Sequence, residues 1–148
     1  MTQNTGLAVL SIGPADQHQA AFSKILQQSG FPAGGGTIEY CGTVERALAV
    51  LRNTRIPIVV CDADFGWRQV LDKFPSLPDP PFLIVTSRLA DDRLWSEALN
   101  LGAYDVLAKP YDSSEVARVL NMAWVRWVER SATPAWKRRP VATMPMYA

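Results

Sequence analysis

The sequence is poor in the residues that build metal centres and disulfide frameworks. It contains one histidine and two cysteines, Cys41 and Cys61, which have no CxxC spacing and fall on separate predicted strands. A structural zinc site usually takes four cysteine or histidine ligands, so this composition argues against one.

Long apolar runs and an excess of one charge are also missing. No apolar run approaches the roughly 18 to 20 residues that span a bilayer, and residues 1–6 lack the charged and apolar regions of a signal peptide. The net charge is +1, and the basic cluster at residues 137–139 is too short to argue for nucleic-acid binding. We therefore expect a cytoplasmic protein that binds neither nucleic acid nor membranes.

The apolar content is that of a folded chain. Hydrophobic residues make up 48% of the 148 residues, which is enough for one domain with a buried core. Residues 131–148 are rich in proline and alanine. We predict one domain over residues 1–130, followed by a C-terminal tail over residues 131–148.

Five apolar strands alternate with five amphipathic helices along the chain. Strands are predicted at residues 7–11, 37–41, 56–62, 82–86 and 106–108. Helices are predicted to start at Pro14, Thr43, Trp67, Asp91 and Asp112, and to end near residues 29, 51, 74, 101 and 130. This alternation indicates an α/β fold with a parallel sheet covered on both faces, and the common strand order for five such units is 2-1-3-4-5, as in flavodoxin-like folds.

Polar side chains end three of the predicted strands. Asp62 ends the central strand, Thr86 ends the fourth, and Lys109 ends the fifth and precedes Pro110. In the predicted strand order these three side chains converge on one crevice. A carboxylate that can attack phosphorus, a hydroxyl and an ammonium group together suit the handling of a phosphoryl group.

Three segments give the chain a family resemblance. The sequence resembles the receiver domains of response regulators, the CheY-like domains of two-component signalling, at Ile58–Asp62, Val85–Ser87 and Gly102–Tyr111. The resemblance implies a non-enzymatic signalling domain in which Asp62 is the phosphoacceptor, Thr86 and Lys109 contact the phosphoryl group, and the bond before Pro110 is cis. It also implies a sensor histidine kinase or another signalling protein as partner. Two copies would pair through the fourth helix, fifth strand and fifth helix.

The expected Mg²⁺ site departs from the family pattern. Receivers carry two acidic residues just after the first strand, but here residues 11–14 read Ser-Ile-Gly-Pro. Mg²⁺ prefers anionic oxygen ligands, so we expect weak or absent Mg²⁺ binding at Asp62. Asp64 would contribute a backbone carbonyl in the family. Asp16 is the nearby carboxylate, although its place in the first turn of a helix is equally explained by the helix dipole.

Other interpretations of these residues remain open. Asp62 and Lys109 could form a purely structural ion pair. The crevice could instead serve a small flavodoxin-like ligand-binding protein or enzyme. The aromatic switch position of receivers falls on Val106, and Tyr104 and Tyr111 lie nearby but not at that place. We expect His18, on the first helix, to be solvated.

Overall fold

The computed structural model describes residues 7–28 and 36–132 of the chain. Within these ranges five strands form one parallel sheet in the order β2-β1-β3-β4-β5. The strands are β1 (Leu7–Ile12), β2 (Gly36–Cys41), β3 (Ile58–Asp62), β4 (Phe82–Ser87) and β5 (Asp105–Ala108). The predicted strand order and the α/β fold class are confirmed.

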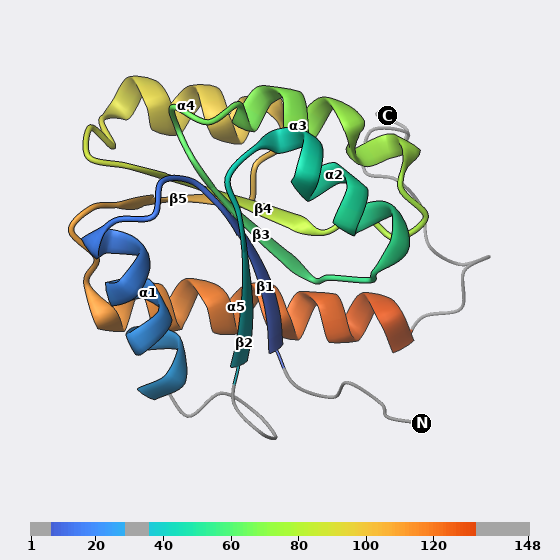
Figure 1. Cartoon of the computed structure of the whole chain (residues 1–148), viewed down its shortest axis with the longest axis horizontal. Coiled ribbons are helices and arrows are strands. Elements are labelled where there is room, and N and C mark those ends of the chain that lie inside the picture. Colours follow the sequence, from blue (N-terminus) through green and yellow to red (C-terminus); the bar gives the residue numbers. More distant parts are fainter. Residues whose placement is uncertain (1–6, 29–35, 133–148) are drawn as a thin grey trace, which may run out of the picture.

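Five α-helices cover the two faces of the sheet in the described part of the chain. They are α1 (Gln17–Gln28), α2 (Val44–Asn53), α3 (Trp67–Lys73), α4 (Asp92–Leu101) and α5 (Ser113–Ala132), and a short 3₁₀ helix, η1 (Phe74–Ser76), follows α3. Helices α1 and α5 lie on one face, and α2, α3 and α4 lie on the other (Figure 1). The doubly wound arrangement with five helices is therefore also confirmed.

The strands supply alternate side chains to two separate apolar layers. In β3, Val59 and Cys61 pack with α2, α3 and α4, while Ile58 and Val60 pack with α1 and α5. All five residues of β3 are buried. This explains the almost unbroken apolar run in the sequence, because a parallel strand covered on both faces has no solvent-facing side.

Several element boundaries differ slightly from the prediction. Helix α1 begins at Gln17 and not at Pro14, because the side chain of Asp16 accepts hydrogen bonds from the first free backbone amides of the helix. Helix α5 continues to Ala132, two residues into the predicted tail. The predicted end of the first helix at Ser29 and the tail from residue 133 lie outside the described residues.

Glycine is required at the turn that leads from β3 into α3. Gly66 has a φ of +86°, and a Cβ atom there would come within 2.8 Å of Cγ2 of Val44. A side chain at this position would therefore be strained and would also collide with α2. The glycine lets the chain turn into α3 only four residues after Asp62.

Candidate functional site

Backbone pairing brings the ends of β3, β4 and β5 together at one edge of the sheet, called the carboxyl edge below. Asp62 lies opposite Thr86 in the β3–β4 register. The amide of Ala63 donates to the carbonyl of Thr86 at 2.8 Å, and the amide of Lys109 donates to the carbonyl of Ser87 at 2.9 Å. The three predicted site residues are thus placed side by side by the sheet itself.

Asp62 and Lys109 form an ion pair with little access to solvent. The ammonium group of Lys109 donates to Oδ2 of Asp62, and the two side chains are 6% and 12% exposed for the lysine and the aspartate respectively. The second carboxylate oxygen, Oδ1, accepts a hydrogen bond from the amide of Asp64 at 2.9 Å. Both oxygens of Asp62 therefore have a partner, which compensates the cost of placing a charge there.

The peptide bond that follows Lys109 has the geometry that the resemblance implied. The Lys109–Pro110 bond is cis. Next to it, Thr86 is only 1% exposed, so its hydroxyl is available to groups inside the crevice and not to bulk solvent.

The thiol beside Asp62 does not compete with it as a nucleophile. Burial and, to a smaller extent, the charge of Asp62 raise the pKa of Cys61 to about 12. A thiol with such a pKa is protonated at neutral pH, and the thiol is a much weaker nucleophile than the thiolate. Among the side chains on β3 that are described above, the carboxylate of Asp62 is the available nucleophile.

The end of β1 approaches Asp62 closely but brings no carboxylate of its own. A Cβ atom at Gly13 would lie 3.2 Å from Cβ of Asp62, and Ile12 is 1% exposed within the apolar layer of α2, α3 and α4. Among residues 7–28 and 36–132, no group of three or more histidine, cysteine, aspartate or glutamate side chains is placed to hold a metal ion.

Asp16 borders the site and also caps α1. Its Oδ1 accepts hydrogen bonds from the amides of His18 at 3.0 Å and Gln19 at 3.2 Å. Partial burial raises the pKa of Asp16, but the Gln19 amide, the charge of Lys109 and the His18 amide together hold it below the ordinary value. Asp16 therefore adds negative charge near Lys109 while one of its oxygens is committed to the helix.

The space around Asp62 consists of a larger cleft and a small inner cavity. The cleft has a volume of about 400 Å³, and its lining includes two cationic residues, Lys109 and Arg88. The inner cavity has a volume of about 20 Å³, room for one water molecule, and is bordered by Asp62, Thr86 and Tyr111. Arg88 and Tyr111 were not predicted as site residues.

His18 is buried, contrary to the sequence expectation. Its side chain is 9% exposed, and its ring meets that of Tyr111 edge to face at a centroid distance of 6.4 Å. Helical periodicity alone could not show this, because the covering ring comes from residue 111 at the far end of the sequence. The signal available was that His18 and Phe22 share one face of α1.

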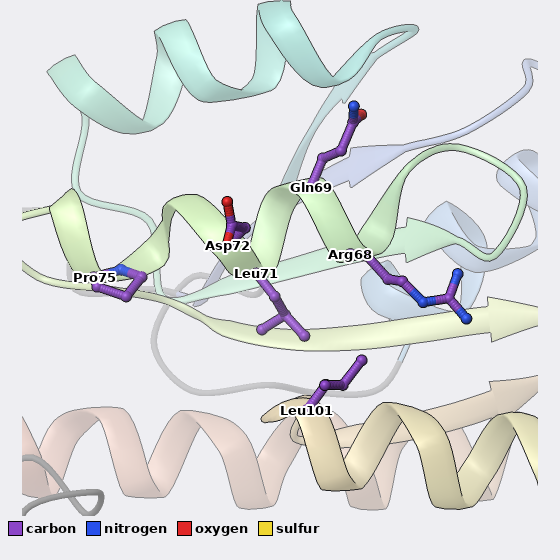
Figure 2. A pocket seen from close by; sticks show the side chains of 6 residues that line it. All are labelled: Arg68, Gln69, Leu71, Asp72, Pro75 and Leu101. Atoms are coloured by element: carbon purple, nitrogen blue, oxygen red, sulfur yellow. The ribbon is translucent and has the colours of Figure 1, made fainter.

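A second groove lies away from the carboxyl edge, between α3 and the end of α4. It has a volume of about 510 Å³, and Figure 2 shows the side chains around it: Arg68, Gln69, Leu71, Asp72, Pro75 and Leu101. None of the predicted site residues borders it. The chemistry of a carboxylate, a hydroxyl and an ammonium group is therefore confined to the carboxyl edge.

The helices of the described ranges are too short or too polar to cross a lipid bilayer. Sequence comparison gives no relatives, since neither a protein-family profile nor any curated protein matches the chain.

Solved structures do match the chain over most of its length. The signal receiver domain of a putative LuxO repressor protein from Vibrio parahaemolyticus has a TM-score of 0.72 at 16% identity, covering 84% of this chain and 95% of that one. The signal receiver domain of an HD domain-containing protein from Pseudomonas fluorescens Pf-5 has a TM-score of 0.67 at 22% identity, covering 90% and 98%. An atypical orphan response regulator has a TM-score of 0.67 at 16% identity, covering 82% and 98%. The chain therefore has the CheY-like fold of response-regulator receiver domains.

Proposed function

We propose that this chain is a receiver-like protein of two-component signal transduction, with Asp62 as its candidate phosphoacceptor. The observation that carries the proposal is the ion pair between Asp62 and Lys109 beside the buried hydroxyl of Thr86. These three groups lie at the carboxyl edge of a CheY-like sheet, where open α/β folds bind their ligands.

The geometry supports a simple transfer reaction. A carboxylate oxygen of Asp62 attacks the phosphorus of a phosphohistidine, the nitrogen–phosphorus bond breaks, and the imidazole leaves. Lys109 then moves from the carboxylate to the oxygens of the new acyl phosphate, where it balances their charge. Thr86 donates its hydroxyl proton to one of the same oxygens. A sensor histidine kinase is the proposed donor.

Mg²⁺ is proposed to assist this reaction poorly. The position next to Asp62 is Gly13, which has no side chain, and Asp16 uses one oxygen to cap α1. A missing unit charge at about 4 Å is worth up to roughly 4 kcal/mol at an effective dielectric constant of 20. We infer that the described residues do not fit a tight Mg²⁺ site, even with the carbonyl of Asp64 available as a ligand.

The output is proposed to be contact with another protein. Helices α4 and α5 each expose a large side chain, Trp95 at 49% and Met122 at 47%. Exposed aromatic and methionine side chains favour protein interfaces, which supports pairing of two copies through α4, β5 and α5. One of the structurally similar proteins is described as an atypical orphan response regulator with a phosphorylation-independent regulatory mechanism. This supports weak dependence on phosphate here.

An enzyme or ligand-binding function at the same crevice has less support. The inner cavity has room for about one water molecule, and most of the residues that line the cleft are polar or charged. Small-molecule sites usually enclose most of their ligand in an apolar pocket. A cofactor that remains bound through purification would favour this alternative.

The test is incubation with acetyl phosphate and Mg²⁺, followed by intact mass measurement. We expect a partial phosphoryl adduct that disappears in Asp62→Asn and persists in Asp64→Asn, the matched control for a neighbouring carboxylate. A stoichiometric adduct at millimolar Mg²⁺ would contradict the impaired metal site. The absence of any adduct under all conditions would contradict the assignment of Asp62 as a phosphoacceptor.

A further inference from the structure

The side chain of Tyr111 connects the crevice to helix α1. Its ring meets Phe22 edge to face at a centroid distance of 5.3 Å and an interplanar angle of 68°. It also meets His18 at 6.4 Å and 85°. Both partners lie on the buried face of α1. The ring is therefore wedged between the end of β5 and the first two turns of α1.

Tyr111 also lies beside Thr86 and Asp62 in the crevice. Tyr111 borders the inner cavity together with both residues. Burial, assisted by the charges of Asp62 and Asp16 and opposed by hydrogen bonding to the Thr86 side chain, raises the pKa of Tyr111 to about 12. The phenol is therefore neutral at physiological pH and keeps its proton to donate.

The position on β5 from which an aromatic ring was expected faces the other way. Val106 is 5% exposed and packs in the layer formed with α2, α3 and α4. Tyr111 instead packs in the layer formed with α1 and α5. The aromatic side chain that reaches Thr86 thus comes from the α1 side of the sheet.

The Thr86 hydroxyl has a single proton, and this links what happens at Asp62 to the contact with Tyr111. If an oxyanion at Asp62 takes the proton of Thr86, the oxygen of Thr86 can only accept from Tyr111. Hydrogen bonds in such a chain polarise one another. A change of charge at Asp62 therefore fixes the orientation of the Tyr111 hydroxyl. The Tyr111 ring transmits this change to His18 and Phe22, which it contacts on α1.

We propose that Tyr111 is the positioning residue of Thr86 and that it couples the chemical state of Asp62 to helix α1. The positioning role rests on the proposed function, because a phosphoryl group is the ligand that Thr86 would meet. The coupling to α1 does not rest on the proposed function, because removal of the Asp62 charge changes the electrostatics of the crevice without any phosphoryl group.

The coupling is tested by backbone amide NMR on a double-mutant cycle of Asp62→Asn and Tyr111→Phe. Tyr104→Phe is the matched control, since Tyr104 is a partly buried tyrosine that packs on Phe82 at 5.2 Å. The reporters are the amides of residues 22–26, beyond the first turn that Asp16 caps. We expect Asp62→Asn to shift these amides in the wild-type and Tyr104→Phe backgrounds. In Tyr111→Phe the shifts should fall to less than half.

Shifts of residues 22–26 that are the same in all three backgrounds would overturn the coupling, as would their absence in the wild type. The positioning role is tested by adding acetyl phosphate and Mg²⁺ to the same variants. We expect several-fold less adduct in Tyr111→Phe than in Tyr104→Phe, and equal adduct would overturn the role. If even the wild type forms no adduct, the proposed function and the positioning role fail together, while the NMR cycle still decides the coupling.

Discussion

The two edges of the sheet hold ion pairs that are built differently. At the carboxyl edge, one lysine pairs with Asp62, and both side chains are almost inaccessible. At the opposite edge, called the amino edge below, Asp79 pairs with two arginines, Arg55 and Arg130, and the side chains are 23% to 52% exposed. In the first pair a single cation meets the carboxylate beside the small inner cavity, whereas in the second two cations share one carboxylate.

The arginine cluster at the amino edge is held in place by several contacts besides the charges. The guanidinium groups of Arg55 and Arg130 each lie 4.7 Å from the ring centroid of Trp127. Arg55 also donates to Ser131 at 2.6 Å. Such redundancy indicates a structural role in fixing the end of α5. The described partners of the Asp62 carboxylate are the ammonium group of Lys109 and the amide of Asp64. The proposed function requires this carboxylate to exchange its cationic partner.

The largest effect is expected from Lys109→Met, which leaves the carboxylate of Asp62 without its cation. Removing one partner of a buried pair costs about 3–5 kcal/mol, and we expect about 2–3 kcal/mol because the cleft admits some water. Urea unfolding followed by circular dichroism measures this loss. Lys73→Met, on the exposed end of α3, should change stability little.

The double variant Asp62→Asn, Lys109→Met should recover most of that loss, because no charge is then left unpaired. A single variant as stable as the wild type would show that water solvates Asp62 through the cleft. In that case the contrast between the two edges would not hold.

A smaller effect is expected from Asp79→Asn at the amino edge. Exposed ion pairs contribute about 0.2–1 kcal/mol each, so loss of both pairs should cost about 1 kcal/mol. Hydrogen exchange should increase at residues 127–132, where α5 ends. Glu97→Gln, which breaks the exposed pair with Arg68, is the control and should leave these amides unchanged. Hydrogen-exchange protection of residues 127–132 that is equal in Asp79→Asn and Glu97→Gln would show that aromatic stacking alone holds the end of α5.

Local sequence patterns predicted the carboxyl edge well and the amino edge not at all. Apolar runs that stop at Asp62, Thr86 and Lys109 are readable because each strand and its final residue are contiguous. The contacts of Asp79 join residues 24 and 51 positions apart, and no periodicity records them. The Tyr111 contact was missed for a related reason, because the expected aromatic position was sought on β5 and not beyond it.

Asp16 shows a different limit of sequence reasoning. The sequence offered two interpretations of Asp16: a carboxylate in the first turn of a helix, favoured by the helix dipole, or a carboxylate that reaches the site. In the structure one oxygen caps α1 while the side chain also borders the cleft. A short carboxylate at the start of a helix that follows a sheet edge can do both, since the helix begins where the site lies.

The smallest effect concerns Asp112, where α5 leaves the carboxyl edge on its way to Arg130. The Ser114 hydroxyl and the amides of Glu115 and Ser114 hold the pKa of Asp112 below its ordinary value. A carboxyl whose pKa is lowered on folding contributes stability above its unfolded pKa and loses it as the pH falls through the folded value. Asn can still accept the capping hydrogen bonds but does not titrate.

We therefore expect Asp112→Asn to unfold at a slightly lower urea midpoint than the wild type at pH 7. The gap should close below about pH 4, near the unfolded pKa of aspartate. Ser114→Ala, which removes the largest cause of the lowered pKa, should narrow the gap at pH 7. A gap that persists unchanged to pH 3 would show that the charge of Asp112 contributes nothing. The start of α5 would then be held by its capping hydrogen bonds and its packing without a contribution from charge, unlike its end, where charge and aromatic contacts act together.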